Sequence, residues 1–89
     1  MREEISQAEK AYNQFMSKMD AQTDDEIVEN FNNQVGKKGW TTSRASYEAV
    51  INAQLIKRNI DFSEIGDETS MSYKHKVKLK GKKLYKVES

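Results

Sequence analysis

The sequence contains no cysteine, no proline and a single histidine among its 89 residues. The missing cysteines exclude disulfides, thiolate catalysis and cysteine-ligated zinc. One histidine leaves few ways to assemble a catalytic or metal site, so we expect a protein that is not an enzyme and that holds no metal or cofactor. We interpret this residue, His75, as a half-buried packing residue of a strand. Without proline, turns must be formed by the four glycines and by Asn, Asp, Ser and Thr.

Long hydrophobic runs are also missing. No apolar run approaches the ~18–20 residues of a membrane span, and no signal-peptide core follows Met1. Apolar residues make up 36% of the chain and charged residues 33%, which is typical of a small soluble domain. The length accommodates one hydrophobic core. We therefore expect a single domain over residues 1–89, located in the cytoplasm and without a membrane partner.

Acidic side chains are almost absent from the C-terminal end of the chain. Residues 1–69 carry eight basic and thirteen acidic side chains, whereas residues 70–89 carry seven lysines and one acid, Glu88. The formal charge of +1 for the whole chain hides this separation. A charge asymmetry of this kind indicates an anionic partner.

Three segments of the chain have the apolar spacing of amphipathic helices. They cover about residues 2–19, 23–35 and 43–58. The spacing from Thr23 to Glu26 is that of a capping box, which indicates where the second helix begins. The apolar stripe of the first segment has two interpretations. It packs within one subunit, or it forms the seam of a homodimer or of another protein interface.

The C-terminal segment changes to the period-2 alternation of a strand. Residues 73–87 predict a two-stranded antiparallel β-hairpin that turns at a glycine. A three-residue loop that starts at Gly81 pairs Leu79 with Tyr85 and Val77 with Val87 on the inner face. Leu84 then points outward.

The expected fold class is α+β, with a three-helix core followed by a C-terminal two-stranded antiparallel β-hairpin. This is the element order of winged-helix domains, in which the third helix enters the major groove and the hairpin contacts the backbone. The comparison concerns element order alone, because no motif of that family is matched. The connection over residues 36–43 is also longer than a helix-turn-helix turn. Outward positions on the third helix would be Arg44, Asn52 and Gln54.

A basic loop precedes the third helix. No acid occurs between Asn30 and Tyr47, and the helix begins near Arg44, whose charge opposes the helix macrodipole. Free amides, hydroxyls and a guanidinium would converge there, which indicates an anion site. The alternative is a plain helix cap at Thr42 or Ser43, with Arg44 in water or paired with an early Glu.

Trp40 and the hairpin lysines each have two interpretations as well. The indole stacks on a base or anchors a partner, or it covers the core. The lysine row protects a sheet edge, or it forms a field suited to a phosphate backbone.

Our first hypothesis is a small non-enzymatic module that binds nucleic acid or another polyanion. Its candidate binding residues are Lys37, Lys38, Trp40, Thr42, Ser43, Arg44, Lys74, Lys76, Lys78, Lys80, Lys82 and Lys86.

Overall fold

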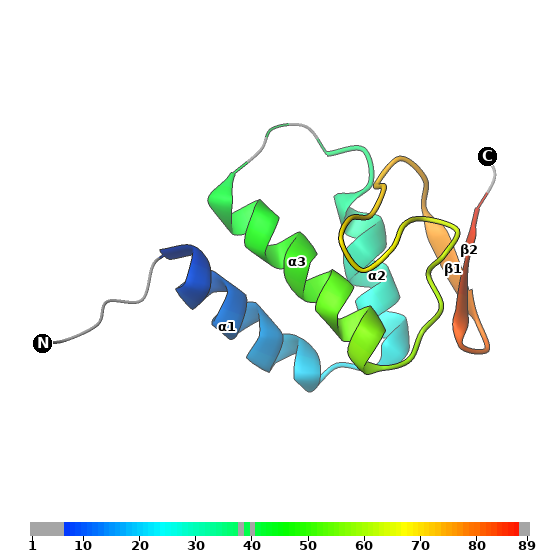
Figure 1. The fold of residues 1–89 in the computed structure, drawn as a ribbon, viewed down its shortest axis with the longest axis horizontal. Coiled ribbons are helices and arrows are strands. Elements are labelled where there is room, and N and C mark those ends of the chain that lie inside the picture. Colours follow the sequence, from blue (N-terminus) through cyan, green and yellow to red (C-terminus); the bar gives the residue numbers. More distant parts are fainter. Residues whose placement is uncertain (1–6, 38, 40, 88–89) are drawn as a thin grey trace, which may run out of the picture.

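Three helices are followed by a β-hairpin in the computed structural model, which describes residues 7–37, 39 and 41–87 (Figure 1). The elements are α1 (Gln7–Asp20), α2 (Asp24–Gln34), α3 (Thr42–Lys57), β1 (Val77–Lys80) and β2 (Lys83–Lys86). The expected α+β class and its element order are confirmed. The predicted beginning of the first helix, residues 2–6, lies outside the described residues.

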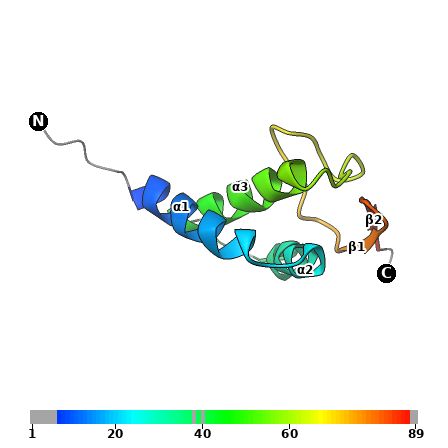
Figure 2. The ribbon, with the colours of Figure 1, turned by 90° about the horizontal axis from the view of Figure 1, so that it is seen from below.

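The helix α3 is the central element of the fold. The helix α1 packs along α3, α2 packs against another side of α3, and β1 lies beside α2 (Figure 1 and Figure 2). The core therefore draws on all three helices and on the hairpin. Its largest fully buried side chains are Phe31, Met19, Ile27, Ile51, Leu55, Leu84, Gln54 and Val50.

The ends of α2 follow the local signals in the sequence. Thr23 Oγ1 accepts a hydrogen bond from the Glu26 N–H at 3.2 Å, and Glu26 Oε1 accepts one from the Thr23 N–H at 2.8 Å. The predicted capping box is thus confirmed, and it satisfies two amides that the first helical turn leaves without partners. Past the other end of α2, Gly36 has the left-handed φ of 77° that commonly stops a helix.

The beginning and the outer surface of α3 differ from expectation. The cap is Thr41, whose Oγ1 accepts a hydrogen bond from the Arg44 N–H at 3.0 Å, and not Thr42 or Ser43. Gln54, expected on the outside, has no exposed surface. The expectation for Gln54 is wrong because α1 and α2 both pack against α3, and Gln54 lies on a packed side, where its Nε2 donates to Asp20 Oδ1 and its Oε1 accepts from Arg58 Nε.

The hairpin turns through two residues rather than three. In the antiparallel pair, Leu79 lies opposite Leu84. Lys78 lies opposite Tyr85. Gly81 takes the first turn position with a φ of 63°, the position that favours glycine in type II′ turns. The predicted register is therefore wrong by one residue, and such a shift moves every side chain of β2 to the other face.

Because of this shift, Leu84 is buried in the core and Tyr85 lies on the outer side with Lys78. Val87, expected to face inward, is 42% exposed. The paired strands are also shorter than the predicted hairpin, since β1 begins at Val77. His75 precedes β1 and is exposed, so the interpretation of His75 as a half-buried strand residue is wrong.

The register predicts which hairpin residue stabilises the fold. Leu84→Ala should lower the free energy of unfolding by about 2–5 kcal/mol, because it removes a fully buried side chain. Tyr85→Ala, one position along on the outer side, should cost less than about 1 kcal/mol. Urea denaturation followed by far-UV circular dichroism measures both values. The opposite order of the two losses would favour the three-residue loop.

Candidate functional site

The outer side of the hairpin gathers three lysines and one tyrosine. Antiparallel pairing places Lys78 beside Tyr85 and Lys80 beside Lys83, because directly opposite residues project from the same face of a sheet. We call these four residues the outer hairpin face. The other face of the same strands packs against the helical core.

An open depression of about 330 Å³ lies on the outer hairpin face. Its lining is formed by Lys78, Lys80, Tyr85 and the neighbouring Lys86, and no acid of the described residues takes part. Lys83 Nζ lies 5.2 Å from the centroid of the Tyr85 ring, within range of a cation–π attraction that favours this placement of both side chains. The depression therefore combines positive charge with an aromatic ring.

Most of the C-terminal lysines have no acidic partner among the residues that the structure describes. These lysines are Lys74, Lys76, Lys78, Lys80, Lys83 and Lys86. All of them except the half-buried Lys83 are exposed. Their charges are therefore directed to solvent and can attract an anion from it.

Two carboxylates lie close to this surface, and both are already hydrogen-bonded. Glu64 Oε1 accepts a hydrogen bond from the Lys86 N–H at 3.0 Å. Asp61 Oδ1 accepts one from the Ser63 N–H at 2.9 Å. Hydrogen bonds from Ser63 hold the pKa of Asp61 below its ordinary value, and the charge of Lys83 adds a smaller contribution. Neither carboxylate lines the depression.

Other parts of the chain occupy both edges of the hairpin. Asn32 of α2 donates from Nδ2 to the Val77 carbonyl and accepts from the Val77 N–H at Oδ1, both at 2.8 Å. Beside β2, the Asp61 N–H donates to the Lys82 carbonyl at 2.7 Å, and the Leu84 N–H donates to the Asp61 carbonyl at 2.8 Å. These contacts protect the edges at those positions, so edge protection alone does not account for the lysines on the face.

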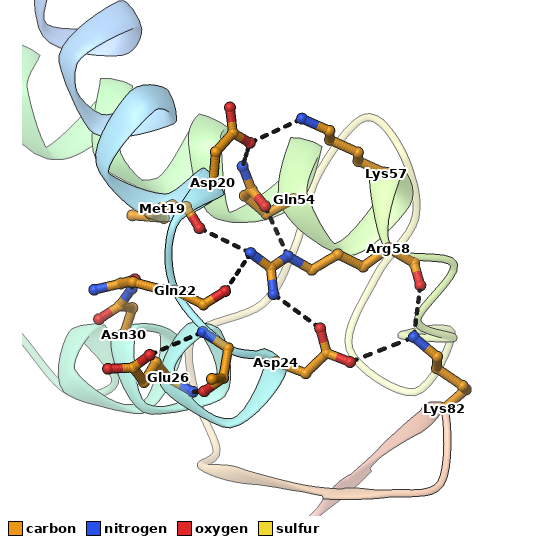
Figure 3. Close-up of polar contacts among 11 residues, drawn as sticks. Met19, Asp20, Gln22, Asp24, Glu26, Asn30, Gln54, Lys57, Arg58 and Lys82 are labelled. Atoms are coloured by element: carbon orange, nitrogen blue, oxygen red, sulfur yellow. Dashed lines mark hydrogen bonds and ion pairs between the residues drawn. The ribbon is translucent and has the colours of Figure 1, made fainter.

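Lys82 has a different role from the other hairpin lysines. Its Nζ lies 3.3 Å from Asp24 Oδ2 and donates to the Arg58 carbonyl at 3.1 Å (Figure 3). These contacts hold the hairpin turn against the beginning of α2 and the end of α3. Lys82, a predicted binding residue, is therefore engaged within the chain.

The Arg58 guanidinium lies at the centre of this junction (Figure 3). Its Nη1 donates to Asp24 Oδ1, its Nη2 donates to the Met19 and Gln22 carbonyls, and its Nε donates to Gln54 Oε1, all at 2.8 Å. The hydrogen bond from Arg58 is the largest cause that holds the pKa of Asp24 below its ordinary value, and burial opposes it. The ends of α1, α2 and α3 are thereby joined through one side chain.

Arg44 also contacts the chain itself. Its Nε pairs with Glu48 Oε2 at 2.9 Å, which is the early Glu considered as the alternative to an anion site. Its Nη1 donates to the Gly39 and Lys37 carbonyls at 2.6 and 3.1 Å, and its Nη2 donates to the Gln34 carbonyl at 3.3 Å. Because these carbonyls lie at or beyond the C-terminal end of α2, the cation complements the negative end of that helix. The charge that opposes the macrodipole of α3 thus stabilises α2.

The basic loop and the hairpin lie apart. Figure 1 and Figure 2 place the beginning of α3 and the hairpin towards opposite ends of the helical part, with α2 between them. Lys37 and Ser43 are exposed near the loop. Lys38, Trp40 and the side chain of Thr42 lie outside the described part of the chain. The described residues of the loop therefore do not extend the surface of the hairpin.

Sequence reasoning missed one member of the outer hairpin face, Tyr85, and left Lys83 out of the candidate binding residues although Lys83 belongs to the lysine row. It assigned Tyr85 to the core because the loop was taken to be one residue too long. A signal was present at Gly81, because a glycine followed by one further residue matches a type II′ turn. That turn places Leu84 opposite Leu79 and sends Tyr85 outward.

No protein-family model matches the chain, and comparisons with the curated proteins and with the solved structures find no match either. None of the described helices has the length and apolar character needed to cross a bilayer. Among the described residues, no cluster of His, Asp and Glu could hold a metal ion. A functional inference must therefore start from the chemistry of the outer hairpin face.

The Arg58–Asp24 contact predicts a specific dependence of stability on pH. Because the pKa of Asp24 is lowered in the folded state, its carboxylate stabilises the protein above the unfolded pKa, and this contribution is lost as pH falls through the folded pKa. Asp24→Asn should therefore lower stability at neutral pH. It should also reduce the further loss between about pH 5 and about pH 2. Urea midpoints across this range provide the measurement.

Asp25→Asn is the matched control, since it removes one exposed carboxylate from the same helical turn. This variant should keep more of the parent's pH dependence than Asp24→Asn. An equal change in both variants would show that the charge of the α2 N-terminus, and not the contact with Arg58, is responsible.

Proposed function

We propose that this protein is a small nucleic-acid-binding module whose binding surface is the outer hairpin face together with Lys86. The observation that carries the proposal is the depression lined by Lys78, Lys80, Tyr85 and Lys86, to which no acid of the described part of the chain contributes. Closely spaced ammonium groups neutralise phosphates and release the counterions that surround a nucleic-acid backbone. Lys74 and Lys76, exposed just before β1, add positive charge to the same end of the molecule.

The distribution of acids supports the same surface. Asp20 and Asp24 are paired with Lys57, Arg58 and Lys82 at the helix junction. Of the hairpin lysines that the structure describes, Lys82 is the one with an acidic partner. The remaining hairpin lysines keep their full charge towards solvent. The acidic helix α2 would repel a phosphate backbone, which favours approach to the outer hairpin face.

The proposal gives no direct role in binding to Arg44 or Lys82, because both are held by contacts within the chain. Lys37 is exposed, but it belongs to the connection between α2 and α3 and not to the outer hairpin face. Replacing Lys37 should therefore affect binding less than replacing a lysine of the outer hairpin face.

Binding can be measured by fluorescence anisotropy with a labelled oligonucleotide over a series of salt concentrations. The double variant Lys78→Gln/Lys80→Gln should bind about tenfold more weakly at low salt, and its plot of log affinity against log salt should be shallower by about 2. Two phosphate contacts would then have been removed. Both lysines are exposed, so the fold should be unaffected.

Lys10→Gln/Lys18→Gln is the charge-matched control. Both of these lysines are exposed on α1 and make no ion pair with the described residues. At about 0.15 M salt this control should keep the parent's affinity within about twofold, since charges farther from the ligand than a Debye length of about 8 Å are largely screened. An equal loss in both variants would contradict a specific surface, and no loss in either would exclude the hairpin. Heparin can be added as a competitor of the labelled oligonucleotide. If it competes as well as unlabelled nucleic acid of equal charge, the protein binds polyanions in general.

A further inference from the structure

We infer that the outer hairpin face binds single-stranded nucleic acid, with one base stacked on the Tyr85 ring and the adjacent phosphates on the lysines. The inference rests on the proposed function and adds the form of the ligand. It depends on three observations: the position of the ring in the depression, the position of Lys83 on that ring, and the way in which the hairpin is embedded in the fold.

The ring of Tyr85 contributes chemistry that phosphate binding does not need. It lies across from Lys78 in the ladder and lines the depression together with Lys80 and Lys86. Lysines alone would suffice to hold a backbone. A flat aromatic side chain between cations is the arrangement by which proteins bind single strands, because every base has a face that can stack on it.

The Tyr85 ring borders the depression and is held in place by a neighbouring lysine. Lys83 Nζ lies over the Tyr85 ring, 5.2 Å from its centroid. Lys83 does not line the depression, whereas Tyr85 does. This cation–π contact restrains the Tyr85 ring, so less conformational freedom is lost when a base stacks on it.

The surroundings of the hairpin disfavour a double-stranded ligand. A two-stranded ribbon reads duplex DNA by entering the major groove, which is about 12 Å wide. Here Asn32 of α2 is bonded to the edge of β1, and Asp61 is bonded to the edge of β2. The hairpin is thus one face of a thicker body and not a projecting ribbon. The bases of a duplex are also stacked on one another, so they cannot reach Tyr85 without being flipped out.

The test compares Tyr85→Leu, which removes the flat ring, with Tyr85→Phe, which keeps it. The probes are an oligothymidylate, an oligouridylate of equal length, a duplex, and an oligonucleotide of abasic sites. Tyr85→Leu should weaken binding to the two single strands about tenfold and leave binding to the abasic strand within about twofold. Tyr85→Phe should bind all four probes like the parent. The two single-stranded probes also separate a DNA ligand from an RNA ligand.

An equal loss on the abasic strand would overturn the inference, because the ring would then act only by placing the lysines. Unchanged binding of single strands by Tyr85→Leu, or tighter binding of the duplex by the parent, would overturn it as well. The double variant Lys78→Gln/Lys80→Gln distinguishes failure of this inference from failure of the proposed function. If Lys78→Gln/Lys80→Gln loses affinity for every probe while Tyr85→Leu loses none, the surface binds nucleic acid without stacking. Circular dichroism and urea midpoints check that each variant is folded.

Discussion

The arrangement of the fold depends on the placement of one guanidinium, that of Arg58. From the end of α3 it bonds to the Met19 carbonyl at the end of α1, to the Gln22 carbonyl in the following turn and to Asp24 at the beginning of α2. The side chain is only 15% exposed, so its charge has to be compensated by these acceptors. The second oxygen of Asp24 pairs with Lys82, so the same carboxylate also positions the hairpin turn.

Two sets of charged groups have different surroundings: those paired with one another at this junction, and the hairpin lysines that are exposed to solvent. Two acids of the helical part pair with basic groups of the same chain, Asp20 with Lys57 and Asp24 with Arg58. Asp24 also takes up one lysine of the hairpin turn. Lys78 and Lys80 of β1, two residues apart and on the side away from the core, are left to solvent. The charge separation that is visible in the sequence thus becomes a surface with a defined orientation.

Features that depend on neighbours along the chain could be predicted from the sequence, and features that depend on distant contacts could not. The capping box at Thr23 and the helix order belong to the first kind. Period-2 alternation allowed two hairpin registers, and the choice between them rests on the turn and on the burial of Leu84 in a core built elsewhere. In the candidate site, composition identified the lysines, but the position of Tyr85 follows from that register. The charge of Arg44 opposes the macrodipole of its own helix, α3. Its position could not be predicted because its carbonyl partners lie at the end of α2, at Gln34 and beyond.

The two hydrogen bonds between the Asn32 side chain and the Val77 backbone determine how the hairpin is positioned on α2. Along a strand, the N–H and C=O groups of one residue point to one edge, and those of the next residue point to the other. If the hairpin slid by one residue, the Asn32 amide would meet a residue whose polar groups are already used in pairing with β2. If it slid by two, His75 or Leu79 would have to take the buried place of Val77. The two hydrogen bonds of Asn32 are therefore compatible with one position of the hairpin along α2. That position determines which side chains of the hairpin are exposed to solvent.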